Sequence, residues 1–364
     1  MFMKAALISG TSKSSRWTVD ALGKYFDEVD HLDVKYLDIN FSGKKAEVLY
    51  EGKPVPHYDC LLIKGSFRYA QLLRALADLF SANESVFLPI APSAYSIAHD
   101  KLLTQLVLQK RNLPMPRTYL SATIEAAKDV LSKMNYPIIM KFPQGTQGKG
   151  VMFADSFASA STILDALHAL NQPFLIQEYV ETGSTDVRLI VVGDKVAAAM
   201  KRKGHGVDKR ANIHAGGAGE SFVPDAYTEK IAVDAAKAVG ADICGVDILE
   251  GPTGPLIIEI NISPGLQGIT EATKVDVADK IAKYLYDRTK ELSDTRRRRE
   301  TKEIMAELNH DSNGGKEQEL ITQLDFRGAR ILLPELVSKM TGFNESDSVK
   351  LVASKGSLTI NRFM

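Results

Sequence analysis

The sequence predicts a mixed α/β protein, with βαβ units near its start and antiparallel hairpins farther along the chain. In the first hundred residues, short apolar runs alternate with segments of helical spacing, a pattern typical of a parallel sheet. From residue 100 to about residue 290, strand-like runs flank short turns, which indicates hairpins. Of the 364 residues, 45% are apolar and 25% are charged, an ordinary globular balance that excludes disorder across the whole chain.

The first 97 residues are predicted to form a parallel sheet with helices. The predicted strands span residues 4–9, 31–39 and 60–63, and the predicted helices span residues 19–26 and 67–80. Ligands of such sheets bind beyond the carboxyl ends of the strands, so the loops at residues 10–15 and 64–68 are candidate ligand loops. The serine-rich run at residues 12–15 is expected to be a turn. These loops carry four basic residues that could attract an acidic tail or be ordinary surface charge: Lys13, Arg16, Lys64 and Arg68.

The stretch from residue 100 to about residue 290 is predicted to form a second mixed α/β unit. Its predicted helices span residues 100–110, 156–170, 227–239 and 275–285. Its predicted strands span residues 138–142 and 173–180, followed by hairpins at residues 187–202 and 243–262. The hairpin turns coincide with Gly193-Asp194 and with the GPTG run at residues 251–254.

The run PIIMKFPQGTQGKG, at residues 137–150, is a candidate phosphate-binding segment. A predicted strand ends near Lys141, and a loop with Gly145, Gly148 and Gly150 follows. Glycines let backbone N–H groups approach phosphates closely, and a lysine adds positive charge. The Walker motif GxxxxGK[ST] is absent. The pattern is equally compatible with a plain glycine-rich turn.

Asp247, Glu259 and Asn261 form a candidate metal site on the second hairpin. Glu259 and Asn261 are two residues apart in a predicted strand and therefore project from one face. A turn centred near Thr253 brings Asp247 opposite Glu259 within about one residue. Two carboxylates and an amide oxygen suit Mg²⁺ or Mn²⁺. The alternative is a pair of surface acids, but the apolar neighbours on both strands make unpaired carboxylates costly there.

A basic and polar set surrounds the first hairpin and the segment after it. Its members are Asp186, Arg188, Lys201, Arg202, Lys203, Arg210 and Asn212. Arginines in such an arrangement can bind a triphosphate through paired hydrogen bonds. Taken singly, each of these residues is typical of surface charge.

Several observations bear on the protein's surroundings. The chain has 45 basic and 45 acidic residues, so no overall basic excess points to nucleic acid or a membrane. The two cysteines, Cys60 and Cys244, lie in strand-like runs and are predicted to be buried thiols. No apolar run approaches the roughly 18 residues that a membrane span needs, and no signal peptide is evident. We therefore expect a cytoplasmic protein without a membrane partner.

Taken in order, the motifs resemble the ATP-grasp superfamily and, more narrowly, RimK-type (alpha-L-glutamate) carboxylate–amine ligases. The similarity rests on residues 100–118, the IMKFPQGTQGKGV loop, QEYV at residues 177–180, the hairpin around residues 186–202, KRANIHAGG at residues 209–217, and residues 245–269. It covers roughly residues 1–290. It implies an ATP-grasp fold with a pre-ATP-grasp domain at residues 1–97, a central and lid region at residues 98–180, and a C-terminal nucleotide and metal domain at residues 181–290.

The resemblance also implies a role for each matching residue. Lys101, Lys141 and the loop with Gly148 would contact the nucleotide phosphates. The segment Gln177, Glu178, Tyr179 and Val180 would hold the adenine, and Asp186 the ribose. The catalytic set Arg188, Arg202, Arg210 and Asn212 would surround the triphosphate and an acyl phosphate. Asp247, Glu259 and Asn261 would hold two Mg²⁺ or Mn²⁺ ions, and residues 263–268 would help to bind substrate.

The sequence departs from the RimK pattern beside the substrate. Members usually read FRSN and then HRGG, whereas this chain has KRAN at residues 209–212 and HAGG at residues 214–217. An aromatic residue and an arginine are thus replaced. The nucleotide and metal residues are intact, but the pattern leaves the identity of the substrate open.

The last part of the chain is predicted to be separate. Residues 291–316 are charge-rich, with four consecutive arginines, and are expected to form a solvated helix and a linker; a patch for nucleic acid or an acidic partner is the alternative. Residues 317–364 resemble the AbrB/SpoVT swapped-hairpin module, which implies a small β-rich module. Such modules dimerise, and many bind DNA, so we expect a homo-oligomer, a dimer or a tetramer, with DNA binding as the alternative.

The resemblance implies an ATP-dependent ligase that forms an amide bond through an acyl phosphate. It would add glutamate or another amino acid to the C-terminus of a protein or peptide. Two alternatives stay open: a ligase that glutamylates a small cofactor, and a nucleotide-sensing regulator that binds DNA. The acceptor and the added amino acid are not specified by the sequence.

Overall fold

The computed structural model describes residues 2–42, 45–143, 150–203 and 219–310, and then residues 325–327, 330–334, 337–338, 341–344 and 346–363. The chain folds as two compact units, Met1–Leu292 and Ser293–Met364. The three regions predicted at residues 1–97, 98–180 and 181–290 all lie within the first unit, and they stay predictions as domains.

The first unit begins with the predicted parallel sheet. Its strands, in the order β2-β1-β6, are β1 (Lys4–Ser9), β2 (Glu28–Asp33) and β6 (Cys60–Ile63). Its helices are α1 (Lys13–Leu22), α2 (Ala70–Ser81), preceded by the 3₁₀ turn η2 (Phe67–Tyr69), and α3 (Pro92–Ile97). The strand β1 pairs in parallel with both neighbours, and all four residues of β6 are buried. The carboxyl ends of the strands therefore meet at one edge.

Two predictions in this region were wrong in detail. The helix predicted at residues 19–26 begins earlier, at Lys13, because the Ser12 hydroxyl accepts a hydrogen bond from the Ser15 N–H and caps it; the predicted turn is the first helical turn. The strand predicted at residues 31–39 is interrupted by the 3₁₀ turn η1 (Val34–Tyr36).

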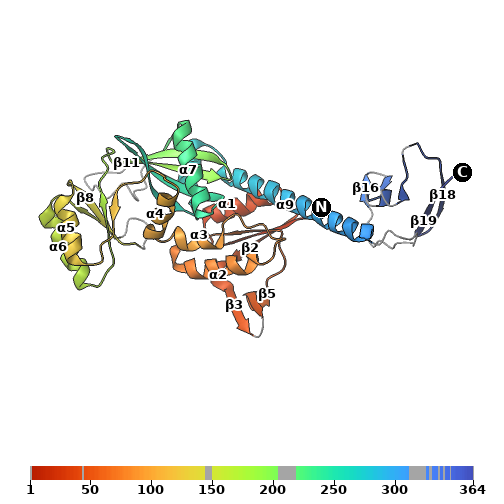
Figure 1. The fold of residues 1–364 in the computed structure, drawn as a ribbon, viewed down its shortest axis with the longest axis horizontal. Helices are drawn as coiled ribbons and strands as arrows, with labels where there is room; N and C mark the ends of the chain where they lie inside the picture. The colour runs from red at the N-terminus through yellow and green to blue at the C-terminus, as the bar shows by residue number, and fades with distance from the viewer. Residues whose placement is uncertain are drawn as a thin grey trace. The chain divides into compact units, whose positions relative to one another are not determined.

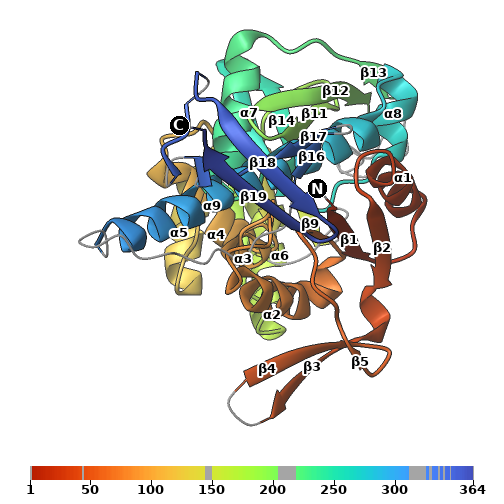
Figure 2. The same cartoon turned by 90° about the vertical axis from the view of Figure 1, so that its right-hand side faces the viewer.

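The second half of that predicted strand belongs to a three-stranded arm that projects from the parallel sheet (Figure 2). The arm consists of β3 (Leu37–Ser42), β4 (Lys45–Tyr50) and β5 (Lys53–Pro54).

A four-stranded sheet with its own core forms the middle of the first unit. Its strands, in the order β7-β10-β8-β9, are β7 (Thr118–Tyr119), β8 (Ile138–Lys141), β9 (Val151–Ala154) and β10 (Leu175–Glu178). Two helices, α5 (Ile124–Lys133) and α6 (Phe157–Ala169), lie on its outer side (Figure 1). Leu131, Met140 and Leu164 belong to a hydrophobic cluster that is separate from the main core. We call this part, residues 118–178, the lid.

A five-stranded antiparallel sheet completes the first unit. Its strands, in the order β13-β12-β11-β14-β15, are β11 (Thr185–Val192), β12 (Lys195–Lys203), β13 (Glu220–Ser221), β14 (Ile243–Gly251) and β15 (Gly254–Asn261). The associated helices are α4 (Lys101–Lys110), α7 (Ala226–Val239) and α8 (Gln267–Thr273). Both predicted hairpins are confirmed, and α7 packs beside the sheet (Figure 2).

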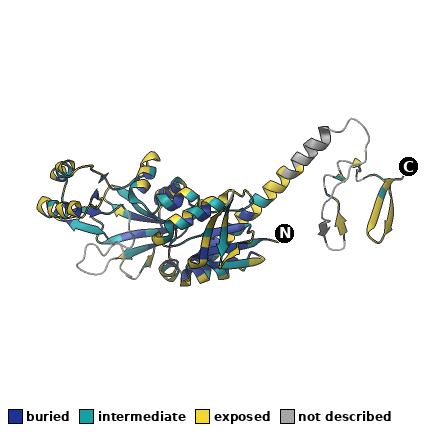
Figure 3. Ribbon diagram, turned by 90° about the horizontal axis from the view of Figure 1, so that it is seen from below, coloured by how far each residue is buried: buried dark blue, intermediate teal, exposed yellow. Residues whose placement is uncertain are grey.

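The parallel sheet and the five-stranded sheet share one hydrophobic core. Leu7 and Leu62 belong to the same buried cluster as Ile190 and Val246, and the buried residues concentrate in the strands of both sheets (Figure 3). Cys60 and Cys244 are free, buried thiols in this core, as predicted. Burial raises the pKa of each thiol to about 12. The lid, by contrast, has a core of its own.

The helix α9 (Val277–His310) continues from the first unit into the second. The predicted helix at residues 275–285 and the charge-rich run that follows are thus one helix, and its four arginines, residues 296–299, are exposed. The second unit has two hairpins, β16 (Asp325–Arg327) with β17 (Arg330–Leu332), and β18 (Val349–Ser354) with β19 (Ser357–Arg362). Within the described ranges, no helix is both long and apolar enough to cross a membrane.

Candidate active site

Lys141 lies on the inner face of the lid sheet, away from the lid core. Ile138 and Met140 of the same strand belong to that core, so the alternation of the strand places Lys141 on the opposite face. Its Nζ donates a hydrogen bond of 2.9 Å to Oε1 of Gln177 on the neighbouring strand β10. Nε2 of Gln177 in turn donates to Oγ1 of Thr118 at 2.7 Å. Gln177 is therefore held from both ends and fixes the lysine.

Three charged side chains from three elements act on one another at this face. They are Lys101 at the start of α4, Lys141 at the end of β8 and Glu259 on β15. The pKa of Lys141 is lowered to about 8, mainly by burial and also by the charge of Lys101, against the influence of Glu259. Burial also lowers the pKa of Lys101, against the influence of Glu259. Two desolvated lysines close to one carboxylate form a local excess of positive charge that suits a polyanion.

The three strands β11, β14 and β15 align the predicted acids and arginines in one row. Arg188 lies opposite Asp247, and Asp247 lies opposite Glu259, as the sequence predicts for the two acids. Arg188 binds Asp247 through two hydrogen bonds, Nε to Oδ1 at 2.8 Å and Nη2 to Oδ2 at 2.7 Å. Arg202 adds a bond from Nη2 to Oδ2 of Asp247 at 2.9 Å. Although burial favours its neutral form, the two arginines lower the pKa of Asp247 to about 2.

Asp186, to which the resemblance assigns the ribose, pairs with an arginine in the structure. Its side chain is buried beneath Arg202, which donates from Nε to Oδ1 at 2.7 Å and from Nη2 to Oδ2 at 2.5 Å. A carboxylate held in this way positions Arg202, and its contact with a ribose stays a prediction. The pairing follows from the register, because Asp186 lies directly opposite Arg202 in the hairpin. Counting outward from the Gly193-Asp194 turn would have placed Lys201 opposite Asp186, because a β-bulge between Ile190 and Val191 shifts the register by one residue.

The donor set at Asp247, Glu259 and Asn261 fits a hard divalent cation. Oδ2 of Asp247 accepts from both arginines, but among the described residues Oδ1 accepts only from Arg188, which leaves it one lone pair. Glu259 makes no hydrogen bond or ion pair with any residue that the structure describes, and burial raises its pKa. Oδ1 of Asn261 accepts from the Ser263 N–H at 2.8 Å.

The same donor set is too small to hold a cation by protein atoms alone. Among the described residues, no group of three or more His, Cys, Asp or Glu side chains could do so. A cation here would need further oxygen ligands from water and from a bound phosphate. Mg²⁺ is usually coordinated in this way.

The segment predicted to hold adenine is fixed largely by its own side chains. Oε1 of Glu178 accepts from the Arg117 N–H at 2.8 Å, and the ring of Tyr179 meets Phe153 edge-on. Together with the Gln177 bonds, these contacts engage the side chains of the segment with residues in and next to the lid. In the part of the chain that the structure describes, the N–H group of Val180 has no hydrogen-bond partner. It is thus available to a base.

Three predicted site residues, Gly148, Arg210 and Asn212, lie outside the described residues, as do the two departures from the RimK pattern at residues 209–217. The other predicted residues of the lid and of the five-stranded sheet are all described, so the geometry above covers both sides of the candidate site.

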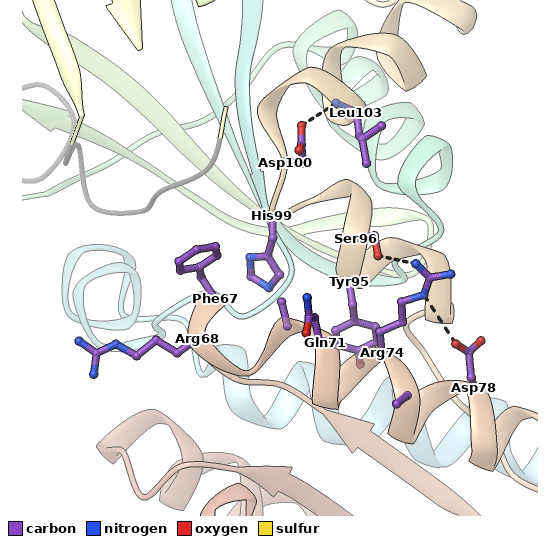
Figure 4. A pocket seen from close by; sticks show the side chains of 12 residues that line it. Phe67, Arg68, Gln71, Arg74, Asp78, Tyr95, Ser96, His99, Asp100 and Leu103 are labelled. Atoms are coloured by element: carbon purple, nitrogen blue, oxygen red, sulfur yellow. Dashed lines mark hydrogen bonds and ion pairs between the residues drawn. The ribbon is translucent and has the colours of Figure 1, made fainter. Parts of the chain in front are cut away.

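A pocket that the sequence did not suggest opens beside the start of α4. Its volume is about 770 Å³, and α2, α3 and the η2 turn line it (Figure 4). The rings of Phe67 and His99 meet edge-on in its wall, and burial lowers the pKa of His99. Nε2 of His99 is buried and has no hydrogen-bond partner among the described residues. The aromatic character of Phe67 was visible in the sequence, but only the fold brings it to His99.

Comparison with known proteins agrees with this arrangement. Residues 98–285 match the model of the RimK-like ATP-grasp domain. The probable alpha-L-glutamate ligase of Marinomonas sp. (strain MWYL1) is 36% identical over 304 residues, which make up 81% of this chain and 98% of that protein. That of Saccharophagus degradans is 37% identical over 274 residues, or 73% of this chain and 88% of that protein.

Solved structures show the same fold at lower identity. The ATP-grasp ligase PsnB complexed with a minimal precursor has a TM-score of 0.62 at 18% identity, over 78% of this chain and 99% of PsnB. The macrocyclase MdnC from Microcystis aeruginosa MRC, bound with the precursor peptide MdnA, has a TM-score of 0.59 at 16% identity, over 78% of this chain and 100% of MdnC.

Proposed function

The chain belongs to the RimK-like ATP-grasp family, and from this premise we propose that it is an ATP-dependent ligase that joins a carboxylate to an amine. The observation that carries the proposal is the juxtaposition of Lys101 and Lys141 with the Asp247–Glu259 pair. One side of this site attracts phosphates, and the other side offers oxygen ligands to a cation.

In this proposal ATP lies between the lid and the five-stranded sheet. The N–H group of Val180 binds the adenine, and Lys101 and Lys141 bind phosphate oxygens. Asp247, Glu259 and Asn261 would hold two Mg²⁺ or Mn²⁺ ions, which offset the charge of the transferring phosphoryl group when they are bound. The structure that is solved for PsnB with Mg and ADP supports a nucleotide and a divalent cation in this fold.

The proposed reaction has two steps. An oxygen of the acceptor carboxylate attacks the γ-phosphorus of ATP, the bond from that phosphorus to the bridging oxygen breaks, and ADP leaves. The amine nitrogen then attacks the acyl carbon of the acyl phosphate, the bond to phosphate breaks, and the nitrogen loses a proton as the amide forms. Arg188 and Arg202, fixed by Asp247 and Asp186, stabilise the charge on the transferring group. Arg210 and Asn212 are proposed to join them.

Glutamate is the amine substrate that the relatives favour, because those described above are named as probable alpha-L-glutamate ligases. A peptide acceptor is supported by PsnB and MdnC, which are solved with precursor peptides. We therefore propose that the protein adds glutamate to the carboxylate of a peptide or protein. A small acceptor is an outcome that the experiment below distinguishes.

The test is ADP release by the purified protein with ATP, Mg²⁺ and a panel of amino acids, with and without peptides that end in glutamate. Growth of a peptide by one residue mass supports the proposal and identifies the amino acid. ADP release without peptide growth indicates a different acceptor, such as a small cofactor. Absence of ADP release under every condition contradicts the proposal.

The metal assignment has its own test. Glu259→Gln keeps the shape of the side chain but removes the charge, so we expect ADP release to fall by about 100-fold or more. Glu250→Gln is the matched control, because Glu250 is an exposed acid at the far end of the same hairpin and should keep its activity. Normal ADP release by Glu259→Gln would contradict the assignment.

A further inference from the structure

We propose that Lys64, at the carboxyl end of β6, binds a substrate carboxylate that does not react. The inference rests on the proposed ligase function and adds a residue for substrate recognition from the first domain. Lys64 lies at the end of the parallel sheet, and its neighbour Gly65 contacts the loop that follows β15.

The end of β6 is fixed at this position by two hydrogen bonds. The Lys64 N–H donates to the Ile8 carbonyl at 2.9 Å, which places Lys64 beside Ser9 at the end of β1. The Tyr95 hydroxyl donates to the Ile63 carbonyl at 2.7 Å. Ligands of parallel sheets bind at this edge of the strands.

The same strand end contacts the candidate metal site through the loop at residues 263–268. The Gly65 N–H donates to Oγ of Ser263 at 2.8 Å, and the Ser263 N–H donates to Oδ1 of Asn261 at 2.8 Å. A second tie runs from the Leu266 N–H to Oγ of Ser14 on α1 at 3.0 Å. Lys64 is therefore adjacent to a residue that lies two hydrogen bonds from a proposed metal ligand.

Lys64 has no partner for its charge among the residues that the structure describes. Its ammonium group makes no hydrogen bond or ion pair with any described residue, although solvent still reaches part of the side chain. Burial lowers the pKa of Lys64 to about 8, and no carboxylate counteracts this effect. The positive charge of Lys64 lowers the pKa of His31, and Nε2 of His31 lies 3.0 Å from Oγ of Ser9. A desolvated ammonium without an anion is costly, and a bound carboxylate would relieve that cost.

The first turn of α1 adds to the attraction for an anion at this edge. Three residues separate the end of β1 from the start of α1, and α1 has 10 residues, long enough for a helix dipole to act. The nucleotide phosphates are not the expected ligand here. The charges that act on Lys101 are those of Glu259 and Asp100, and the charges that act on Lys141 are those of Lys101 and Glu259; Lys64 is not among them.

A carboxylate at Lys64 has two possible sources, the added amino acid and the acceptor peptide. The test measures both in the full-length protein by isothermal titration, with AMPPNP and Mg²⁺ present so that no turnover is needed. The probes are L-glutamate and a peptide that ends in two glutamates. The variants are Lys64→Met, Lys64→Arg and, as the control, Lys35→Met, an exposed lysine of the same domain.

We expect Lys64→Met to weaken the binding of one probe by at least about tenfold, Lys64→Arg to restore part of it, and Lys35→Met to bind normally. The probe that is affected identifies the source. AMPPNP should bind all variants equally. Thermal unfolding should show no loss of stability in Lys64→Met, because that change removes a partly buried charge that has no partner among the described residues.

Equal binding of both probes to wild type and Lys64→Met, or no binding of either probe to wild type, would overturn the inference. The proposed ligase activity is judged separately, by ADP release from wild type. If the wild type releases ADP and Lys64→Met binds both probes normally, the ligase proposal is supported and the role of Lys64 in substrate binding is contradicted.

Discussion

At the residue scale, the candidate site contains two lysines, Lys101 and Lys141, whose pKa values are lowered by burial. Lys141 is buried, its Nζ donates to Gln177, and its pKa is lowered to about 8 by burial. The groups that act on it are Lys101 from α4 and Glu259 from β15. In the proposed complex the phosphates of ATP would supply the missing negative charge, which ties nucleotide affinity to the protonation of this lysine.

This coupling predicts a pH dependence of nucleotide binding. A lysine with a lowered pKa is charged below that value and neutral above it, so the affinity for ATP should fall as the pH rises through about 8. Lys141→Arg keeps its charge throughout and should bind ATP with little change between pH 7 and pH 9. Titration of AMPPNP at both pH values checks this. A wild-type affinity that does not change over this range would argue against contact between Lys141 and the phosphates.

How far single residues could be predicted depends on their partners. The sequence identified Arg188, Arg202 and Asp247 as site residues, and the structure brings all three into contact. It did not predict that the arginines bind the acids directly. Ion pairs depend on which side chains meet across strands, and this is decided by register rather than by residue type. Lys64 was noted only as a basic loop residue, because its lack of a partner is a property of the fold.

At the element scale, the β11–β12 hairpin sets the geometry of the arginines. Asp186 and Arg202 lie opposite each other, and the Asp186 side chain is 1% exposed against 16% for Arg202. Removing one member of a buried pair leaves the other charge without compensation. The hairpin therefore depends on this pair both for stability and for the orientation of Arg202.

Asp186→Ala should consequently destabilise the first unit and slow the reaction. We expect a loss of about 3 kcal/mol in the free energy of unfolding, because Arg202 keeps only its contact with Asp247. Urea unfolding followed by circular dichroism measures the loss. Asp194→Ala, in the turn of the same hairpin, is a control that should cost little. If Asp186→Ala were as stable as wild type, the ion pair would not support the hairpin.

Elements with strong periodicity were predicted well, and those decided by caps or breaks were not. The hairpins and the parallel strands follow directly from alternation and turn chemistry. The start of α1 was missed because a serine run is compatible with both a turn and a capped helix. The break after β2 depends on a single 3₁₀ turn, whose cap is the side chain of Asp33. A single capping side chain, such as Ser12 or Asp33, changes a sequence-based prediction less than the apolar pattern of the residues around it.

At the scale of the whole molecule, the chain is longer than its relatives. The Marinomonas relative is matched over 98% of its length but covers only 81% of this chain. The second unit has described strands but no described residue that is buried. On β18 and β19, Leu351 and Leu358 share one face of the hairpin and are 61% and 49% exposed. A two-stranded hairpin with an open apolar face is only marginally stable in water.

This face leads us to expect that the second unit joins copies of the chain, as the sequence predicts for a homo-oligomer. The double variant Leu351→Ser, Leu358→Ser in the full-length protein should lower the particle mass to that of a monomer. Light scattering coupled to size exclusion measures the mass. The control is Lys350→Ser, Thr359→Ser, on the opposite face of the same hairpin, which should assemble like wild type.

ADP release per chain separates assembly from catalysis in these variants. The described site residues lie in the first unit, whose two cores consist of residues 3–285. Loss of assembly should therefore leave the rate per chain within about twofold of wild type, since the altered residues belong to the other unit and are not among the described site residues. A wild type that is already monomeric would show that the hairpin face is covered within one chain. A double variant that keeps the oligomeric mass would show that the copies join through another surface.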